Sequence, residues 1–457
     1  MNNPIHPFVI AKFGGTSVAN YQAMCSSANT VINNPKIRVI VLSASAGITN
    51  LLVELAKGCE AEVRQQHINK IQAIQDEIIA HLPNSSSIKE KINQIILNIA
   101  ALSEAANLAN SKALTDELVC HGELMSSQLF VEVLKQQQKN AVWFDVRSVM
   151  KTNNHFGEAQ PEFEQIKQLC QSQLKPLCNE NTIIVTQGFI GSESENKTTT
   201  LGRGGSDYSA ALLGEALNAT QIDIWTDVAG IHTTDPRITS GAKRINEITF
   251  AEAAEMATFG AKILHPATLV PAMRSNIPVF VGSSKDPKAG GTFVYSTQSI
   301  TSELPLFRAL ALRRKQTLLT LHSLQMLHAQ GFLANVFTIL AKHNISIDLV
   351  TTSEVSVAVT IDTAGTNTNG NSLITPELID ELSAVCTVEV ETDLALIAII
   401  GNNLTTTKGV AKHVFEHLEQ FSIRLTCYGA STHNICFLVK NNDADNIITL
   451  MHKAILE

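Results

Sequence analysis

Short apolar segments alternate with helical patterns over the N-terminal two thirds of the chain. Parallel strands that are buried on both faces read as continuous apolar runs, and the intervening helices cover those faces. The pattern therefore predicts an open, mainly parallel sheet within an α/β/α sandwich. The expected strands are Phe8–Phe13, Val39–Leu42, Thr182–Val185, Asp223–Trp225 and Pro278–Val281.

One long segment departs from this alternation. Glu60 to Leu134 is almost wholly helical in pattern and rich in Ala, Gln, Ile, Leu and Glu, with an internal turn at Pro83–Ser87. We interpret it as a helical lobe, at about residues 60–134, inserted at the substrate end of the sheet. The N-terminal domain is predicted to span residues 1–298, and the polar stretch Ser296–Glu303 is the best linker candidate.

The C-terminal third contains a repeat. The first copy, residues 314–392, reads as strand, helix, strand, strand, helix and strand. The second copy, residues 393–457, follows the same order but ends before its sixth element. The free strand Phe307–Leu312 can supply the missing strand, so we predict a second module built from 306–313 with 393–457. Both modules are expected to be ferredoxin-like α+β domains.

Glycines that follow the first apolar strand indicate candidate chemistry. Lys12 lies where this strand emerges from the sheet, and Gly14 and Gly15 follow it. Glycines let backbone N–H groups approach a polyphosphate closely, while a lysine supplies a point charge. The order differs from that of a Walker loop, in which the lysine follows the glycines. By itself the segment also suits a strand that ends in a tight turn with a solvated lysine.

A second glycine-rich element lies far downstream. Thr198–Leu213 joins a glycine turn to an apolar helix, and Ser206 or Asp207 is placed to cap that helix. A helix N-terminus attracts anions, and the fork of Arg203 suits a carboxylate or a phosphate. A third glycine loop, Gly188–Gly191, follows another apolar strand. Three such loops in one chain favour an anion-binding site over isolated turns.

Seven motifs occur in order along the chain: KFGGTS (12–17), SASAGITN (43–50), HGEL (121–124), TLGRGGSD (200–207), WTDVAGI (225–231), TDPR (234–237) and FGAKILHP (259–266). Together they resemble the aspartokinases of the amino-acid kinase family, and most closely their lysine-sensitive, monofunctional branch. The resemblance covers essentially the whole chain. It implies an amino-acid kinase domain followed by tandem ACT domains, which are small modules that bind amino acids.

The resemblance also implies a reaction, the ATP-dependent phosphorylation of the side-chain carboxylate of L-aspartate to 4-phospho-L-aspartate. This is the first step toward lysine, threonine, methionine and diaminopimelate. Lys12 would bridge the transferred phosphoryl group and the substrate, and Asp207 would orient Lys12 through an ion pair. The implied substrate-binding residues are Thr49, Glu123 for the α-ammonium, Arg203 for the α-carboxylate, Gly204, Gly205 and Ser206.

The nucleotide-binding residues are likewise implied by the resemblance. They are Lys12, Gly14, Gly15, Thr226, Asp227, His232, Arg237 and Lys262. His232 departs from the family, which usually carries tyrosine there, and an imidazole offers less area for stacking on adenine. Phosphate chemistry implies Mg²⁺, but the sequence contains no dedicated carboxylate cage. We therefore predict a metal held mainly by phosphates and water, and no metal site formed by the protein itself.

The ACT repeats imply feedback inhibition, with L-lysine as the effector. Asp348 and Glu354 could receive its cationic groups and Ser353 its carboxylate, unless these acidic residues are ordinary solvated turn residues. Paired ACT modules often meet across a two-fold axis, so we expect a homodimer or a dimer of dimers. The predicted effector site consists of Met326, Phe332, Leu333, Ser346, Asp348, Thr352, Ser353, Glu354 and Val355.

Composition narrows the class of protein. The chain has 457 residues, 44% of them hydrophobic, and a net charge of -8 without a basic stripe, which argues against nucleic acid as a partner. Its eight cysteines form no C-x-x-C pair and suit reduced thiols in the cytoplasm. The N-terminus has no signal-peptide pattern, and the longest apolar runs are too short to cross a membrane.

Three alternative functions deserve comparison with this one. Another amino-acid kinase, acting on acetylglutamate, glutamate, carbamate or a nucleoside monophosphate, is disfavoured by the HGEL and FGAKILHP motifs with a tandem ACT tail. From the length of the chain we do not expect a bifunctional enzyme with homoserine dehydrogenase, because no G-x-G-x-x-G unit follows the repeats. A non-catalytic amino-acid sensor is the alternative from a different class. The retention of Lys12, Glu123, Arg203 and Asp207 counts against it.

Overall fold

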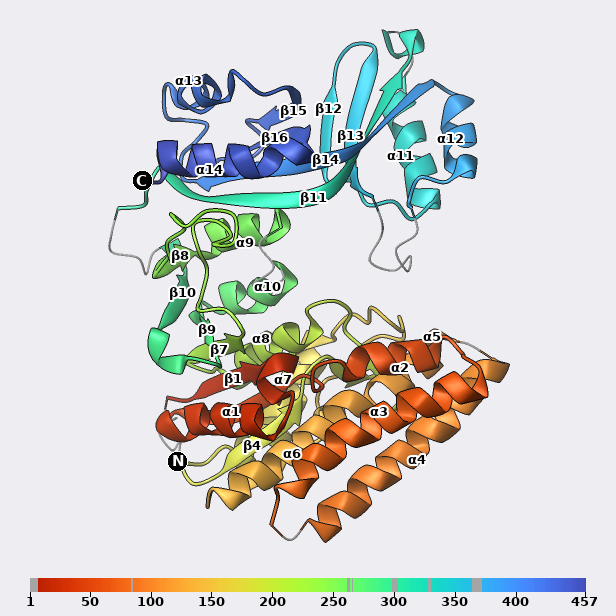
Figure 1. Ribbon diagram of the computed structural model, residues 1–457, viewed down its shortest axis with the longest axis vertical. Coiled ribbons are helices and arrows are strands. Elements are labelled where there is room, and N and C mark those ends of the chain that lie inside the picture. The colour runs from red at the N-terminus through yellow and green to blue at the C-terminus, as the bar shows by residue number, and fades with distance from the viewer. Residues whose placement is uncertain are drawn as a thin grey trace. The chain divides into compact units, whose positions relative to one another are not determined.

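The computed structural model describes residues 7–457, except for residues 84, 110, 261–263, 265, 298–302, 328–329 and 364–371. The chain divides into two units, which are described separately (Figure 1). The first contains most of the chain up to residue 301. The second contains residues 302–457 together with two earlier segments, 232–243 and 251–261. The boundaries predicted from the sequence place both of these segments in the N-terminal domain instead.

An eight-stranded sheet forms the centre of the first unit, in the order β3-β4-β2-β1-β7-β9-β10-β8. Neighbouring strands are parallel except β9 and β10, so the predicted mainly parallel sheet is confirmed. Three short strands, β3, β8 and β10, are additions to the predicted set. The strands are β1 Val9–Phe13, β2 Ile37–Leu42, β3 Ala141–Trp143, β4 Ile183–Gln187, β7 Gln221–Thr226, β8 Glu247–Thr249, β9 Val279–Ser283 and β10 Gly291–Tyr295. A separate hairpin pairs β5 Ile190–Ser192 with β6 Thr198–Thr200.

Helices cover this sheet and extend into the expected lobe, where α3, α4 and α6 lie side by side (Figure 1). The lobe shares one apolar core with β1, β2 and α1. Its helices are α2 Ile48–Ala56, α3 Ala61–Ala80, α4 Ser86–Leu108, α5 Lys112–Val119 and α6 His121–Gln136. The others of this unit are α1 Tyr21–Asn33, α7 Phe163–Leu169, α8 Gly205–Leu217 and α10 Pro266–Arg274, with short turns η1 Gly15–Val18, η2 Val146–Ser148, η3 Cys170–Leu174, η4 Lys175–Leu177 and η5 Pro287–Ala289.

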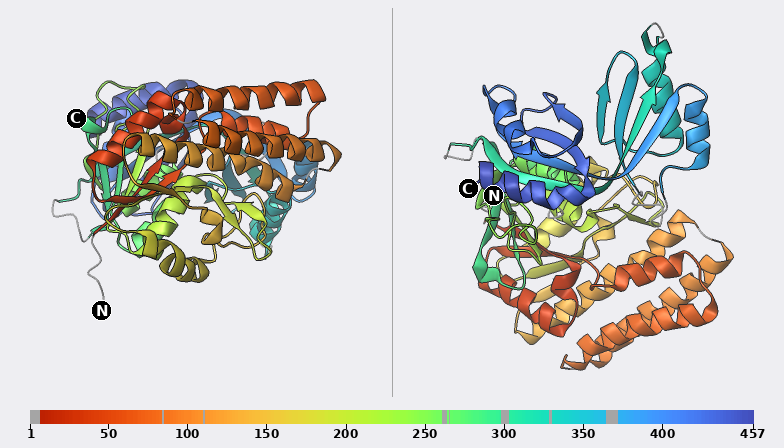
Figure 2. Two further views of the ribbon diagram at one scale, coloured as in Figure 1. Left: turned by 90° about the horizontal axis from the view of Figure 1, so that it is seen from below. Right: turned by 45° about the horizontal axis from the view of Figure 1, so that its top comes forward.

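The second unit contains a six-stranded antiparallel sheet in the order β12-β13-β11-β14-β16-β15. Its two central strands run through both repeats (Figure 2). The strands are β11 Phe307–His322, β12 Leu349–Thr352, β13 Ser356–Asp362, β14 Thr387–Gly401, β15 Ile423–Tyr428 and β16 Asn434–Lys440.

The free strand Phe307–Leu312 and the first strand expected in the first repeat are the two halves of β11. The first half pairs with the end of β14 in the second repeat, and the other half pairs with its beginning. The register shifts around Gln316, and Lys315 adopts a positive φ of 58°. Such a bulge explains why the apolar pattern breaks between the two halves although the strand continues.

Helices pack on this sheet around two apolar cores, one in each repeat. The helices are α11 Phe332–Lys342, α12 Pro376–Ser383, α13 Val410–Phe415 and α14 Ala444–Ile455, with turns η7 Leu324–Leu327, η8 Glu416–Leu418 and η9 Asn441–Asp443.

The helix α9 (Phe250–Thr258) lies almost wholly in the second unit. Its buried Glu252 accepts hydrogen bonds from Arg308 at 2.8 Å and from Asn402 at 2.6 Å. The helix α9 ends at Thr258. Gly260 has a φ of 110°, a backbone conformation that stops a helix and is open to glycine. Lys262 lies outside the described residues.

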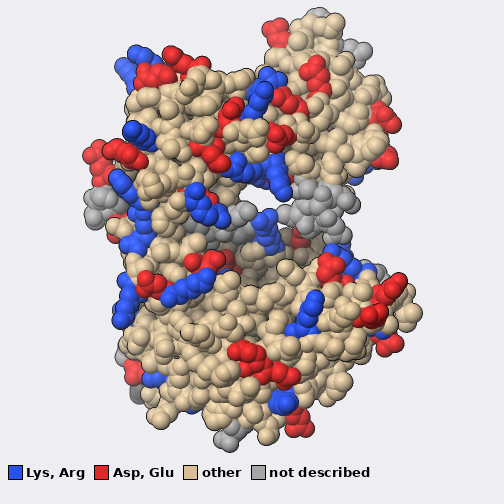
Figure 3. All heavy atoms as spheres, in the orientation of Figure 1, with Lys and Arg blue, Asp and Glu red and all other residues tan. Residues whose placement is uncertain are grey.

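Acidic and basic side chains are interspersed over the surface that Figure 3 displays. Within the part of the chain that the structure describes, no helix combines the length and apolarity that crossing a bilayer requires.

Candidate active site

Lys12 lies near the carboxyl end of β1, between Val41 of β2 and Ile224 of β7. Its side chain is largely buried, and its Nζ lies 2.6 Å from Oδ1 of Asp207. An ammonium that is removed from water needs an opposite charge close by, and Asp207 provides it. The ion pair expected from the family resemblance is present. It joins the central strand to the first turn of α8.

The start of α8 differs from the sequence prediction. Neither Ser206 nor Asp207 is the N-cap, because the cap position is Gly204, with a φ of 74° and no side-chain hydrogen bond. Gly204 can adopt this left-handed conformation without a steric penalty. Asp207 therefore lies inside the first helical turn, where its side chain pairs with Lys12 rather than with the backbone. The N-terminus of α8, together with Arg203, makes a site suited to an anion.

Glu123 lies in the first turn of α6 and is almost completely buried. The backbone N–H of Ala44 donates a hydrogen bond of 3.1 Å to its Oε1, whereas Oε2 is buried without a hydrogen-bond partner. Burial raises the pKa of this carboxyl to about 8, and the bond from Ala44 only partly opposes the shift. Ser126 holds the same loop by donating a 2.8 Å hydrogen bond to the carbonyl oxygen of Ser43.

Glycines allow these segments to approach one another closely. A Cβ atom at Gly15 would lie 2.8 Å from the carbonyl oxygen of Ala44. A Cβ at Gly188 would lie 2.7 Å from Ser206, and one at Gly205 would lie 2.7 Å from the ring of Phe189. Real Cβ atoms do not approach other atoms this closely, so side chains at these positions would push the loops apart. The second and third glycine loops therefore meet, whereas the first glycine loop packs on the segment at Ala44.

The meeting point is a cavity of about 320 Å³. It brings together two cations, two carboxylates and the N-terminus of a helix. A small ligand that carries one ammonium and more than one anionic group would find an opposite charge for each. The cavity is lined by Lys12, Ser43, Thr49, Glu123, Phe189 and Gly202–Asp207.

Sequence reasoning missed Asp116, a buried residue of α5. Its carboxylate accepts a 2.8 Å hydrogen bond from the N–H of Gly157. Thr200 donates two more, one of 2.9 Å from its N–H and one of 2.8 Å from its hydroxyl. Burial raises the pKa of Asp116, and these bonds oppose the shift. Thr200 precedes the loop that carries Arg203, so Asp116 anchors that loop. A helical acidic residue gives no such signal in the sequence. Phe189 and Gly202 also line the cavity but were not among the predicted site residues.

The residues expected to bind nucleotide are only partly brought together. Gly14 donates its N–H to the carbonyl oxygen of Trp225 at 3.1 Å, so the first glycine loop adjoins the end of β7 with Thr226 and Asp227. His232 and Arg237 belong to the second unit. The guanidinium of Arg237 is 88% exposed and pairs with Asp235 at 2.7 Å.

The predicted effector residues cluster around the first repeat. Met326 lies in the short turn η7 and Phe332 begins α11, and both pack on the core of this repeat. Leu333 is 39% exposed. Ser346 and Asp348 precede β12, which begins only at Leu349. Thr352 ends β12, and the turn Ser353–Val355 leads into β13.

Asp348 is not a solvated turn residue. Its Oδ1 accepts a 2.9 Å hydrogen bond from Arg313, whose guanidinium also pairs with Asp362. Burial raises the pKa of the Asp348 carboxyl, while Arg313 opposes the shift. Its Oδ2 is buried without a hydrogen-bond partner, so one acceptor remains available. Ser353 is partly engaged within its own turn, where its hydroxyl lies 2.7 Å from that of Ser356.

Replacing Glu123 by glutamine is expected to make the stability of the protein less dependent on pH. The carboxyl has a pKa of about 8 in the folded protein and an ordinary value of 4.5 when exposed, so only the folded state holds its proton between these values. The parent's free energy of unfolding should then fall as pH rises through this window, by about 1.4 kcal/mol per pH unit at most. The Glu123→Gln variant cannot lose that proton.

Urea unfolding at several pH values, followed by circular dichroism, measures this difference. Glu132→Gln on the same helix α6 controls for the removal of a carboxylate from the surface. If the free energy of unfolding depended on pH in the same way for the parent and the Glu123→Gln variant, the predicted raised pKa would be contradicted.

The sequence matches the model of the amino acid kinase family over residues 7–283 and that of an ACT domain over residues 319–368 and 397–455. The expected α/β/α kinase domain with tandem ACT domains is thereby confirmed. The chain is 60% identical over 449 residues to lysine-sensitive aspartokinase 3 of Escherichia coli (strain K12), covering 98% of this chain and 99% of that protein.

Two solved structures of E. coli aspartokinase III agree with this relationship. The structure in complex with aspartate and ADP (R-state) has a TM-score of 0.89, and that with lysine and aspartate (T-state) has 0.85. Both are 60% identical to this chain, and each alignment covers 98% of this chain and 100% of the other. The chain therefore belongs to the aspartokinases, within the amino acid kinase family.

Proposed function

We propose that this protein uses ATP to phosphorylate the side-chain carboxylate of L-aspartate, forming 4-phospho-L-aspartate, and that L-lysine inhibits it. The observation that carries the proposal is the cavity in which Lys12, Glu123 and Arg203 converge. Aspartate has one ammonium and two carboxylates, and this arrangement offers an opposite charge to each of them.

The substrate is positioned by two charged side chains. Glu123 presents Oε2, an acceptor that is buried without a hydrogen-bond partner, to the α-ammonium. Arg203 presents a planar fork to the α-carboxylate, which favours two parallel hydrogen bonds. Together they orient the side-chain carboxylate toward Lys12. The α-ammonium would also draw the Glu123 carboxyl into its ionised form, because an opposite charge nearby lowers a carboxyl pKa.

Lys12 supplies the charge for phosphoryl transfer. A carboxylate nucleophile has no proton to lose, so the reaction needs positioning and charge neutralisation rather than a base. Asp207, 2.6 Å from the Lys12 ammonium, holds that ammonium in place. The oxygen of the substrate attacks the γ-phosphorus, the bond to the leaving ADP oxygen breaks, and Lys12 stabilises charge on the transferred phosphoryl group.

The nucleotide is assigned to the carboxyl ends of β1 and β7, beside Gly14, Gly15, Thr226 and Asp227. The carboxylates that line the described cavity are Glu123 and Asp207, and Asp207 is already paired with Lys12. The chain thus offers few direct ligands to Mg²⁺. An ion that enters with ATP would be held mainly by phosphate oxygens and water, where it would neutralise phosphate charge.

Replacing Lys12 should stop turnover without removing substrate binding. We expect Lys12→Met to lower kcat by about 10²–10³-fold or more, because a preorganised charge is lost from the transition state. A coupled assay of ADP formation measures kcat, and calorimetry measures binding of L-aspartate. Lys57→Met, at an exposed lysine of the same unit, is the control. Since the change leaves Asp207 unpaired, the double variant Lys12→Met/Asp207→Asn tests whether any loss reflects folding. Activity within about tenfold of the parent would place the catalytic cation elsewhere.

Replacing Arg203 or Glu123, the two residues assigned to the charges of L-aspartate, should affect this substrate selectively. Arg203→Ala and Glu123→Gln are each expected to raise the KM for L-aspartate at least about tenfold while changing the KM for ATP much less. The reason is that each variant leaves one charge of the bound amino acid without a partner. Steady-state kinetics with each substrate varied in turn measures both constants, and Glu132→Gln again serves as the control. Equal increases in both KM values would contradict the assignment.

The lysine site is assigned to the first ACT repeat, around Asp348 and the turn Ser353–Val355. L-lysine carries an additional side-chain ammonium, and the unpartnered Oδ2 of Asp348 is a buried acceptor suited to it. Inhibition requires that lysine bind more tightly to a state that is poor at catalysis. A homodimer, or a dimer of such dimers, built through the ACT domains belongs to the same proposal. A cytoplasmic location suits the eight free cysteines of the chain.

Asp348→Asn and Ser353→Leu should relieve inhibition by L-lysine. We expect the inhibitory concentration to rise at least about tenfold, which corresponds to the loss of roughly one charge-assisted hydrogen bond. Activity without lysine should stay close to that of the parent. Asp380→Asn changes an exposed carboxylate on α12 of the same repeat and should leave inhibition unchanged. A titration of activity against L-lysine measures the inhibition. If Asp348→Asn and Ser353→Leu were both inhibited as strongly as the parent, the effector would bind elsewhere.

A further inference from the structure

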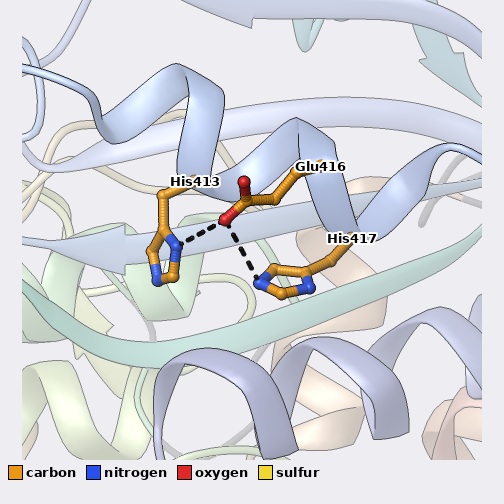
Figure 4. Close-up of side chains that lie close together, drawn as sticks. All are labelled: His413, Glu416 and His417. Carbon is orange, nitrogen blue, oxygen red and sulfur yellow. Dashed lines mark hydrogen bonds and ion pairs between the residues drawn. The ribbon is translucent and has the colours of Figure 1, made fainter.

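A cluster of metal-ligating side chains lies in the second ACT repeat, on α13 and the turn η8 that continues it. His413 lies within α13, and Glu416 and His417 begin η8 (Figure 4). Residues four apart on a helix lie on the same face, so the two imidazoles face the same region of space. The carboxylate of Glu416 lies between them.

Distances within the cluster match those of a metal site. Nδ1 of His413 lies 3.0 Å from Oε1 of Glu416, and Nε2 of His417 lies 3.8 Å from the same oxygen. All three candidate ligand atoms lie within 4.8 Å of one another. Two ligands of a tetrahedral Zn²⁺, each about 2.0–2.2 Å from the ion, lie roughly 3.4 Å apart. The observed separations bracket that value, so small side-chain rotations would suffice.

The ring nitrogen Nε2 of His417 gives an independent indication of a ligand. Nε2 of His417 is buried and lacks a hydrogen-bond partner among the described residues, and 3.8 Å is too long for a hydrogen bond to Glu416. A buried polar atom without a partner is uncommon and calls for an explanation.

We propose that His413, Glu416 and His417 bind one divalent transition-metal ion, with Zn²⁺ as the first candidate. Imidazole nitrogen suits Zn²⁺, Ni²⁺ and Cu²⁺, whereas Mg²⁺ and Ca²⁺ prefer oxygen ligands. The site is therefore chemically distinct from the Mg²⁺ that accompanies ATP. Two nitrogens and one oxygen leave a fourth position for water. A bound ion would link α13 to η8 and restrain this helix of the repeat.

This proposal departs from the sequence-based expectation that the protein itself forms no metal site. That expectation rests on the absence of a carboxylate cage and of metal-type cysteine spacing, whereas the spacing His413-x-x-Glu416-His417 supplies a different ligand set. The proposal is independent of the kinase activity, because its test involves neither aspartate nor ATP.

Equilibrium dialysis of the full-length, untagged protein against micromolar ZnCl₂, followed by elemental analysis, tests the proposal. We expect His413→Gln and His417→Gln each to bind one Zn²⁺ fewer per chain than the parent, with affinity at this site at least about tenfold weaker. The parent loaded with Co²⁺ should also show a visible d–d absorption that both variants lack. Circular dichroism verifies that the variants are folded.

His81→Gln is the matched control. His81 and Glu77 are a histidine–glutamate pair four residues apart at the end of α3, and Nδ1 of His81 lies 3.9 Å from Oε1 of Glu77. Among the described residues, no second histidine completes a three-ligand group with them. This variant should bind Zn²⁺ like the parent. Unchanged Zn²⁺ stoichiometry and affinity in both His413→Gln and His417→Gln would overturn the proposal, as would an equal loss in His81→Gln.

Discussion

The ion pair between Lys12 and Asp207 is the interaction on which the rest of the site depends. A buried ammonium costs several kcal/mol in lost hydration, so it is retained only where a close partner compensates. Strand β1 supplies the cation and helix α8 supplies the anion, at 2.6 Å. The pair therefore fixes the distance between the sheet and the first turn of α8. In the proposed reaction, the pair would also hold the ammonium ready for the charge that develops on the phosphoryl group, without the reorganisation that water would need.

Close packing of backbone is the second constraint, and it explains why the site is rich in glycine. Gly15, Gly188 and Gly205 each lie where a Cβ would fall within 2.8 Å of another segment. Any larger residue at these positions would push the neighbouring segments apart. Asp116, in the helical lobe, also holds neighbouring segments together. Its three hydrogen bonds fix the end of β6 and the loop at Gly157. The lobe is thus tied to the loop that carries Arg203.

Local signals in the sequence were sufficient for much of this structure. The apolar strands, the helical lobe and the repeated order of elements follow from periodicity, and the glycine loops marked the site. Asp116 could not be predicted, because its partners lie far away in sequence. The cap of α8 was misplaced because Gly204 could adopt a left-handed conformation that made a capping side chain unnecessary. The continuity of β11 was hidden by the bulge at Lys315, where the run of charged residues resembles a loop.

Two buried carboxylates, Glu123 and Asp348, show how one chemical group can be adapted to two kinds of site. Each presents an oxygen without a hydrogen-bond partner. Glu123 has no cation at hydrogen-bonding distance among the described residues, so burial favours its neutral form, and an arriving ammonium must also draw off a proton. Asp348 already shares its other oxygen with Arg313. An ammonium there joins an existing ion pair, and Asp362 remains as a second partner for Arg313. In the proposed function, ammonium binding at Glu123 would therefore be coupled to proton release, whereas ammonium binding at Asp348 would be coupled to the distribution of ion pairs within the sheet.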